Sequence, residues 1–154
     1  MYVFALLSAK TAPICRNIST FGHKILMIMT QEQRKELLKN QQGELDAVIM
    51  YQRLANVVKT EREREALLQL AREEGRHASV FHAYTGEALT PKKTLARIVT
   101  MLYRLIGQKR LYKIIARNEY AAFDGYEHLI ADFPEVDSVR HDEKRHGDII
   151  SSLI

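Results

Sequence analysis

Two short motifs pair a carboxylate with an imidazole at a spacing that suits metal binding. Glu74 is followed by His77 and Glu143 by His146, and no other Glu in the sequence has a His three places on. On an α-helix, positions i and i+3 lie on one face, so each pair could offer an oxygen and a nitrogen to one ion. The flanking residues also match, because an acid precedes each Glu and an Arg precedes each His. One such motif is usually chance, but two with matching flanks indicate a shared site.

The apolar pattern predicts helices that would position these motifs. Apolar residues recur at alternating spacings of three and four along four segments, which is typical of amphipathic helices. Start and stop signals bound these segments. The predicted bounds are a first helix after the capping box Thr30/Gln33, a second from the capping box Thr60/Glu63 to Thr85-Gly86, a third over about residues 109–132 ended by Phe133-Pro134, and a fourth from Glu135 to the end.

Each of the four predicted helices has a Glu in the middle of its apolar face. A buried carboxylate without a partner is costly, and four of them would exceed the roughly 5–15 kcal/mol net stability of a domain. Two divalent ions would balance four carboxylates with both histidines neutral. One Glu from each of two helices, plus a Glu-x-x-His from each of the other two, is the di-iron or di-manganese arrangement of four-helix bundles. The predicted metal ligands are Glu44, Glu74, His77, Glu119, Glu143 and His146.

Two tyrosines follow predicted ligand glutamates at the same spacing. Tyr51 follows Glu44 by seven residues, and Tyr126 follows Glu119 by seven. Each Glu-Tyr helix is followed by a Glu-x-x-His helix, so we expect two helical hairpins with the same ligand set, related by a pseudo-two-fold axis. The tyrosines are either plain core aromatics or hydroxyl donors to the ligand carboxylates, where they could assist catalysis.

The acids next to the motifs have two interpretations. Glu73 and Asp142 could orient a histidine, but we expect them to be solvated acids, with Arg76 and Arg145 as surface groups paired to nearby acids. A donor set of carboxylate oxygens and two imidazoles favours iron, or else manganese, over zinc.

Composition sets limits on the class of protein. The 154 residues suit one domain, and the scarcity of Gly and Pro favours helix. Cys15 is the only cysteine, which excludes an internal disulfide framework and a rubredoxin-type iron site, and it favours a reducing, cytoplasmic location. We expect no haem. The mild net charge of +4 does not indicate a nucleic-acid partner.

Two segments do not fit the bundle pattern. Residues 1–29 are expected to be a poorly ordered extension, with Met27 or Met29 as a possible true start. Residues 92–117 contain eight Lys or Arg and no acid, and residues 95–106 form an amphipathic pattern that Gly107 should break. We expect this helix to pack on the bundle or to make a dimer contact; the alternative is a peripheral membrane contact through residues 92–117.

At these residues the sequence resembles the rubrerythrin branch of the ferritin-like superfamily. The resemblance covers roughly residues 30–154 and lies in residues 43–51, 73–78, 118–126 and 142–146. It implies an all-α, antiparallel ferritin-like bundle with a non-haem di-iron centre. In that centre Glu74 and Glu143 would bridge the irons, while Glu44 and Glu119 would be terminal carboxylates. His77 and His146 would each give one nitrogen to one iron.

The sequence departs from rubrerythrins proper in two respects. They have a C-terminal rubredoxin domain, which these residues do not include, so electrons are expected from an external donor or from Fe(II) itself. They also have an extra carboxylate on the third helix, whereas Tyr120 and Ala122 stand beside Glu119 here. The resemblance therefore implies a more symmetric site with less efficient peroxidase cycling.

The expected function is oxidation of two Fe(II) ions coupled to reduction of H2O2 or O2, as a peroxide scavenger or ferroxidase in oxidative stress or iron handling. Phe81 and Tyr84 could help to line the pocket, and a homodimer is expected. One alternative is a membrane-associated quinone hydroxylase of the demethoxyubiquinone hydroxylase type, whose family has a similar ligand pattern. Another alternative is an iron-binding or iron-delivery domain without turnover.

Overall fold

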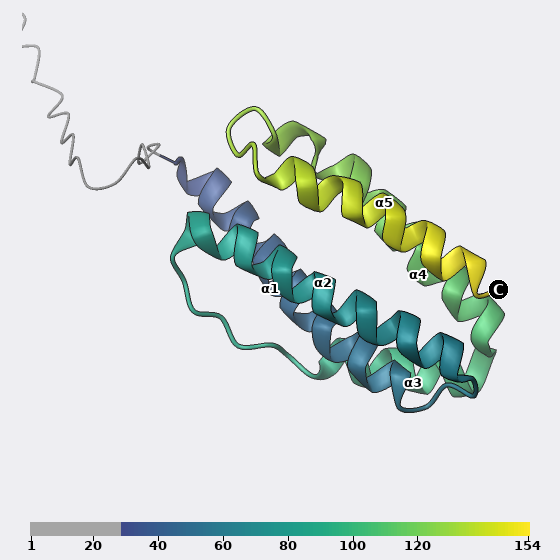
Figure 1. Cartoon of the computed structure of the whole chain (residues 1–154). Helices are drawn as coiled ribbons and strands as arrows, with labels where there is room; N and C mark the ends of the chain where they lie inside the picture. Colours follow the sequence, from purple (N-terminus) through teal and green to yellow (C-terminus); the bar gives the residue numbers. More distant parts are fainter. Residues whose placement is uncertain (1–28) are drawn as a thin grey trace, which may run out of the picture.

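The computed structural model describes residues 29–154 as an all-helical fold without strands in that range (Figure 1). The prediction of an all-α protein is confirmed. The expected N-terminal extension lies, apart from Met29, outside the described residues. The helices are α1 (Gln31–Ala55), α2 (Glu61–Thr85), α3 (Thr94–Ile106), α4 (Gln108–Gly125), the short 3-10 helix η1 (Glu127–Leu129) and α5 (Val136–Ser152).

Both predicted capping boxes are present and set the starts of α1 and α2. The backbone N–H of Gln33 donates to the Thr30 hydroxyl at 3.1 Å, and the Gln33 side chain accepts from the Thr30 N–H at 2.9 Å. Thr60 and Glu63 form the same reciprocal pair at the start of α2. At the other end of α2, Gly86 adopts a left-handed conformation with φ +67°, which a residue without a Cβ adopts readily. These signals are local, so the sequence alone predicted these boundaries.

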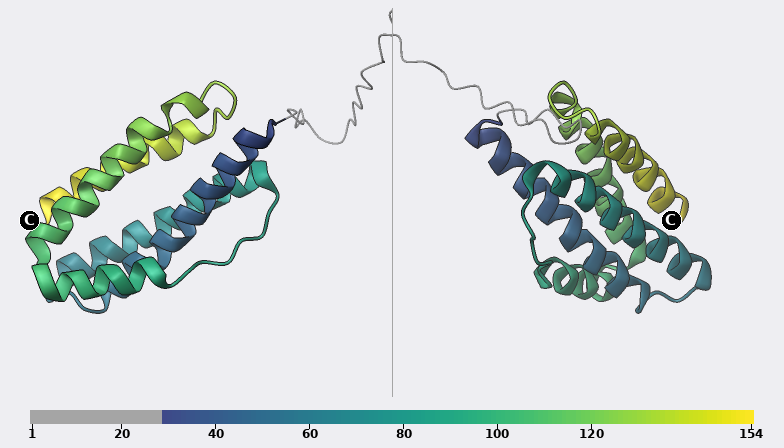
Figure 2. Two further views of the ribbon diagram at one scale, coloured as in Figure 1. Left: turned by 180° about the vertical axis from the view of Figure 1, so that it is seen from behind. Right: turned by 60° about the vertical axis from the view of Figure 1, so that its left-hand side comes forward.

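The long helices form two antiparallel pairs. α1 packs along α2 and α4 along α5, and α2 faces α5 across the middle of the molecule (Figures 1 and 2). The segment from residue 86 to 93 runs back along α1, where the Gln41 amide donates to the Glu87 carbonyl at 2.9 Å. The short helix α3 then contacts both α1 and α4. The two pairs therefore bring the two Glu-x-x-His motifs, which are on α2 and α5, face to face.

The third predicted helix is shorter than expected. Instead of continuing to about residue 132, α4 ends at Gly125, and the chain tightens into η1 and two turns. Gly is a weak helix former, and the tighter path buries Leu129 and Phe133, which expose only 3% and 2%. The predicted break at Gly107 is confirmed, since this residue separates α3 from α4 with φ +78°.

The core consists of two apolar clusters with charged residues between them. One cluster includes Tyr51, Leu54, Leu67, Leu70, Tyr112, Ile115 and Ile150. The other includes Leu37, Phe81, Leu129, Phe133, Val136 and Val139. The helical residues between these two sets in sequence include the six predicted metal ligands. Apolar packing on both sides therefore holds the helices around the charged middle.

The basic amphipathic segment packs on the rest of the protein through only part of its apolar surface. α3 buries Ala96, Val99 and Thr100 and packs against α1, as expected for a helix that covers the bundle. Leu95, Ile98, Met101 and Leu105 stay exposed. Within the part of the chain that the structure describes, no helix is both long enough and apolar enough to cross a membrane.

Candidate metal centre

The structure brings the six predicted ligands together from four helices. Glu44 is on α1 and Glu119 on α4, while the two Glu-x-x-His pairs are on α2 and α5. Each of the six residues exposes 7% of its surface or less. All four carboxylates and both imidazoles therefore lie in the protein interior, although Glu is rarely buried without a partner.

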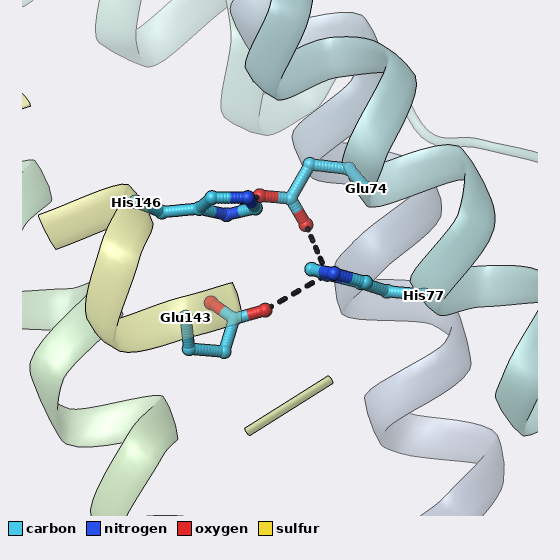
Figure 3. Close-up of side chains that lie close together, drawn as sticks. All are labelled: Glu74, His77, Glu143 and His146. Atoms are coloured by element: carbon cyan, nitrogen blue, oxygen red, sulfur yellow. Dashed lines mark hydrogen bonds and ion pairs between the residues drawn. The ribbon is translucent and has the colours of Figure 1, made fainter. Parts of the chain in front are cut away.

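Glu74, His77, Glu143 and His146 form the centre of this group and point toward one another from α2 and α5 (Figure 3). One potential ligand atom of each lies within 4.8 Å of those of the other three. His77 Nδ1 is 3.0 Å from Glu143 Oε1, and His146 Nδ1 is 3.2 Å from Glu74 Oε1. Each imidazole thus faces the carboxylate of the opposite motif. This cluster could hold a metal ion.

Glu44 and Glu119 lie at the two edges of the cluster. Glu44 Oε2 is 3.6 Å from His77 Nδ1, and Glu119 Oε2 is 3.8 Å from His146 Nδ1. The arrangement is the same on both sides, as the internal repeat of the sequence suggested. Ligation by these two carboxylates stays a prediction.

The outer nitrogen of each imidazole contacts an acid of the opposite motif. His77 Nε2 lies 3.2 Å from Asp142 Oδ2, and His146 Nε2 lies 2.8 Å from Glu73 Oε2. Arg145 joins both acids, with contacts of 3.0 Å to Glu73 and 2.6 Å to Asp142. Our expectation that these acids are merely solvated was wrong. An Nε2–H that donates to the acid leaves the Nδ1 lone pair facing the cluster, which is the orientation that a metal-binding histidine needs.

Neutralising the two outer acids is expected to weaken metal binding without changing the number of ions bound. Acids that orient metal-bound imidazoles typically contribute about 10–100-fold in affinity, so Glu73→Gln and Asp142→Asn should each lower affinity by at least about tenfold. Competition with a chelator measures this change. Glu61→Gln is the matched control, because Glu61 is also an ion-paired acid on α2 but lies at its exposed start beside Arg64. Unchanged affinity in both variants would mean that the two acids only pair with Arg145.

The two tyrosines bridge the hairpins. The Tyr51 hydroxyl on α1 donates to Glu119 Oε1, and the Tyr126 hydroxyl after α4 donates to Glu44 Oε1 at 2.5 Å. Burial, together with the charges of nearby glutamates, raises the pKa of both hydroxyls well above its usual range, so both remain protonated donors. They are therefore hydrogen-bond donors to the cluster and not plain core aromatics. Their part in catalysis stays a prediction.

The cluster lacks a fixed positive charge of its own. Among the described residues, the ion-pair partners of its four glutamates are His77 and His146 alone. His77 Nδ1 and Glu143 Oε1 are buried without a hydrogen-bond partner, although they lie 3.0 Å apart. Orphaned buried polar atoms are costly, and a cation between them would satisfy both. The residues present therefore fit a divalent metal.

The close approach of four buried carboxylates and two imidazoles also determines which of these groups are protonated. Burial, with the charge of Glu44, raises the pKa of Glu74 to about 8, and burial raises the pKa of Glu143 to about 10. Burial alone would lower the pKa of His146, but hydrogen bonds with the cluster carboxylates raise it to about 10. Burial is likewise outweighed at His77, whose pKa is raised by Glu143 and its neighbours. Protons thus hold the cluster together in the absence of a cation, and a metal would displace them.

Two aromatic residues that we expected to help to line the pocket are absent from the lining of the cavity beside the cluster. Phe81 packs edge-on against Tyr126 with ring centroids 5.4 Å apart, and Tyr84 packs against Phe133 at 5.0 Å. Both belong to the apolar cluster around Leu37 and do not line the cavity beside the metal cluster. The reason is helical geometry, because Phe81 and Tyr84 lie one and two turns beyond His77 along α2.

The donor atoms limit the chemistry of the site. If all six predicted ligands bind, carboxylates outnumber imidazoles, and such a donor set generally suits iron or manganese better than zinc. Comparisons with protein-family models, with curated proteins and with solved structures found no match to this chain.

Proposed function

We propose that residues 30–154 form a ferritin-like four-helix bundle that binds two iron ions and couples oxidation of Fe(II) to reduction of H2O2 or O2. The observation that supports this most is the reciprocal placement of the two Glu-x-x-His motifs. Each imidazole presents Nδ1 to the carboxylate of the other motif at 3.0 to 3.2 Å, while an acid contacts its Nε2. This placement supports a shared metal site whose ligands would be oriented from outside.

The site would bind its ions through groups that the fold has already placed. Glu74 and Glu143 are central and could bridge two ions, while Glu44 and Glu119 would each serve one side. Four carboxylates against two divalent ions give a neutral site when both histidines are neutral. The apolar clusters on either side keep these groups buried, and burial strengthens their electrostatic contacts with an ion.

The bound irons would supply the electrons. Reduction of one H2O2 to two waters takes two electrons and two protons; bound Fe(II) would supply these electrons, and an external electron donor would restore Fe(II). The chain's own contribution is to position the ions and to fix the protonation of the groups around them. Tyr51 and Tyr126 hold Glu119 and Glu44 in place through their hydroxyls.

Anaerobic titration with Fe(II), followed by stopped-flow mixing with H2O2 or O2, tests this function. We expect two irons per chain and an Fe(III) absorbance that develops faster than for Fe(II) in protein-free buffer. Faster oxidation by H2O2 than by O2 would assign peroxide scavenging, and the reverse would assign a ferroxidase or oxygenase.

Two outcomes would overturn the proposal in different ways. Iron that binds in the expected ratio but oxidises no faster than free Fe(II) would indicate an iron-binding or iron-delivery domain. Absence of stoichiometric iron binding would remove the metal centre itself.

A further inference from the structure

Exposed apolar side chains gather on one part of the molecule. The described residues leave six large apolar side chains exposed, and five of them are on α3 and α4. These five are Leu95, Ile98, Met101, Leu105 and Ile114. Single exposed apolar residues need no explanation, but a group of them marks a binding surface. The segment from residue 92 to 117, which contains all five, has no acid.

A cavity of about 340 Å³ connects part of this surface to the metal cluster. The exposed side chains of Leu95, Ile98 and Ile114 line its outer part. The buried residues Glu44, Glu74, Glu119 and Glu143 also line the cavity, and the remaining lining is mainly apolar, with side chains such as Met50 and Val99. A molecule that entered at α3 would therefore meet the metal ligands at the end of an apolar passage.

The cavity lies between α1 and α4, whose backbones stay apart although their side chains make contact. Both contact α3, and α3 lies across the space that they leave. The Tyr–Glu hydrogen bonds described above span this space, and small side chains line it, with Ala47 on α1 and Ala122 on α4. A larger side chain at either alanine would fill the passage.

We propose that this cavity binds an apolar organic molecule and is its route to the metal centre. The volume falls in the range of about 300–1,000 Å³ that is usual for small-molecule sites, and it is far larger than H2O2 or O2 needs. The apolar walls offer peroxide few hydrogen bonds, whereas an apolar ligand would gain by leaving water there. The route rests on the proposed metal centre for its chemistry, but binding in the cavity does not depend on iron.

Fluorescence titration of the full chain with 1-aminoanthracene, a neutral apolar probe, tests the cavity. The titration is made on cobalt(II)-loaded and on metal-free protein. We expect saturable binding in both states and a change in the cobalt(II) visible spectrum on binding, because the cavity ends at the ligand carboxylates. Ala122→Phe should weaken binding by about tenfold or more, since the ring would occupy the cavity. Ala47→Phe provides the same test from the opposite wall if Ala122→Phe does not fold.

Leu105→Ser is the matched control. Leu105 is on α3 and exposes 70% of its surface, but it does not line this cavity. Its replacement should leave probe affinity unchanged if the cavity is the site. The inference would be overturned if Leu105→Ser lost probe binding while Ala122→Phe kept it. That result would place the apolar contacts on the outer face of α3, as for a membrane surface. Absence of saturable binding in the unmodified chain would also overturn it.

The two proposals can fail separately. If the protein oxidises iron as expected but does not bind the probe, the result supports the metal centre and excludes the apolar route. A chain that binds the probe in the cavity but takes up no iron would lose the metal function, while the cavity would stand as a ligand site.

Discussion

Glu74→Ala combined with Glu143→Ala is expected to abolish metal binding at the cluster. These two side chains provide the oxygens closest to the inner nitrogens of His146 and His77, at 3.2 and 3.0 Å. Groups that merely orient a ligand contribute about 10–100-fold to affinity, so loss of both central ligands should cost more than about a hundredfold. Anaerobic Fe(II) titration with desalting and iron analysis measures the result. We expect two irons per chain before the substitutions and no retained iron after them.

The control for this experiment is a buried Glu outside the cluster. Glu63 is on the same helix as Glu74 and exposes 5%, but its carboxylate accepts from the Tyr112 hydroxyl at 3.1 Å and completes the cap with Thr60. Glu63→Gln should therefore lower stability and leave iron stoichiometry unchanged. Circular dichroism verifies that each variant remains helical. Retention of two irons by the double variant would show that the ions bind elsewhere and would remove the basis of the proposed function.

The parts of the structure that the sequence predicted depend on local rules. A capping box or a left-handed Gly at a helix end involves residues within a few positions of each other, so Thr30, Thr60 and Gly86 set their boundaries in any tertiary context. The facing of Glu74 and His77 follows likewise from the helical repeat alone. Convergence of the two motifs was predicted from charge, since four buried carboxylates need a common partner.

The parts that the sequence did not predict depend on how the hairpins meet. Glu73 and Asp142 stand one position before a predicted ligand, about 100° around the helix. A side chain at that position could point to solvent or to the opposite hairpin. The packing of α2 against α5 brings each acid into contact with the histidine of the other motif. The acid that precedes both motifs was a signal for this, since a repeated neighbour of a ligand suggests a shared contact.

The end of α4 and the cavity also depend on tertiary packing. A continuous apolar repeat through Tyr126 and Leu129 predicted a longer helix, but the need to bury Phe133 favours a tighter turn after Gly125. The cavity lies where the backbones of α1 and α4 stay apart, and the sequence of neither helix predicts that separation. Tertiary packing thus determines how the candidate metal centre can be reached, whereas local sequence determines its predicted ligands.

Stability of the metal-free protein is expected to fall as the pH rises from mildly acidic to mildly alkaline values, and bound metal should reverse this loss. Burial raises the pKa of Glu74 from 4.5 to about 8 and of Glu143 from 4.5 to about 10, and cluster hydrogen bonds raise that of His146 from 6.5 to about 10. A pKa that is higher in the folded state means that folding favours the protonated form. The corresponding stability is complete below the unfolded pKa and is lost as the pH passes through the folded pKa. The contribution of each of these three groups to the stability of the fold therefore falls between pH 6 and pH 8.5.

One group of the cluster acts in the opposite direction, but outside this window. Burial would raise the pKa of Glu44, yet hydrogen bonds with Glu74 and His77 outweigh burial and lower it below 4.5. Its contribution is present above pH 4.5 and is lost only at more acidic pH. The metal-free protein should therefore be most stable at mildly acidic pH, with losses on both sides.

Metal binding has the opposite pH dependence, because the ion needs deprotonated ligands and displaces their protons. At a hundredfold excess over its dissociation constant, an ion that binds only the folded state adds about 2.7 kcal/mol, which for a chain of this size is roughly 5–10 °C in Tm. Thermal unfolding with and without cobalt(II) in the absence of O2 measures this gain at pH 6 and pH 8.5. We expect a larger gain at pH 8.5.

The double variant at Glu74 and Glu143 separates this effect from the titration of surface groups. Without the two carboxylates, the metal-free Tm should change less between pH 6 and pH 8.5, and cobalt(II) should no longer raise it. The other ionisable groups of the chain are unchanged in this variant, so the difference between the two proteins reports the cluster. A metal-free protein whose Tm rises over this interval, or a cobalt(II) gain that survives in the double variant, would contradict a cluster held together by protons that a metal ion replaces.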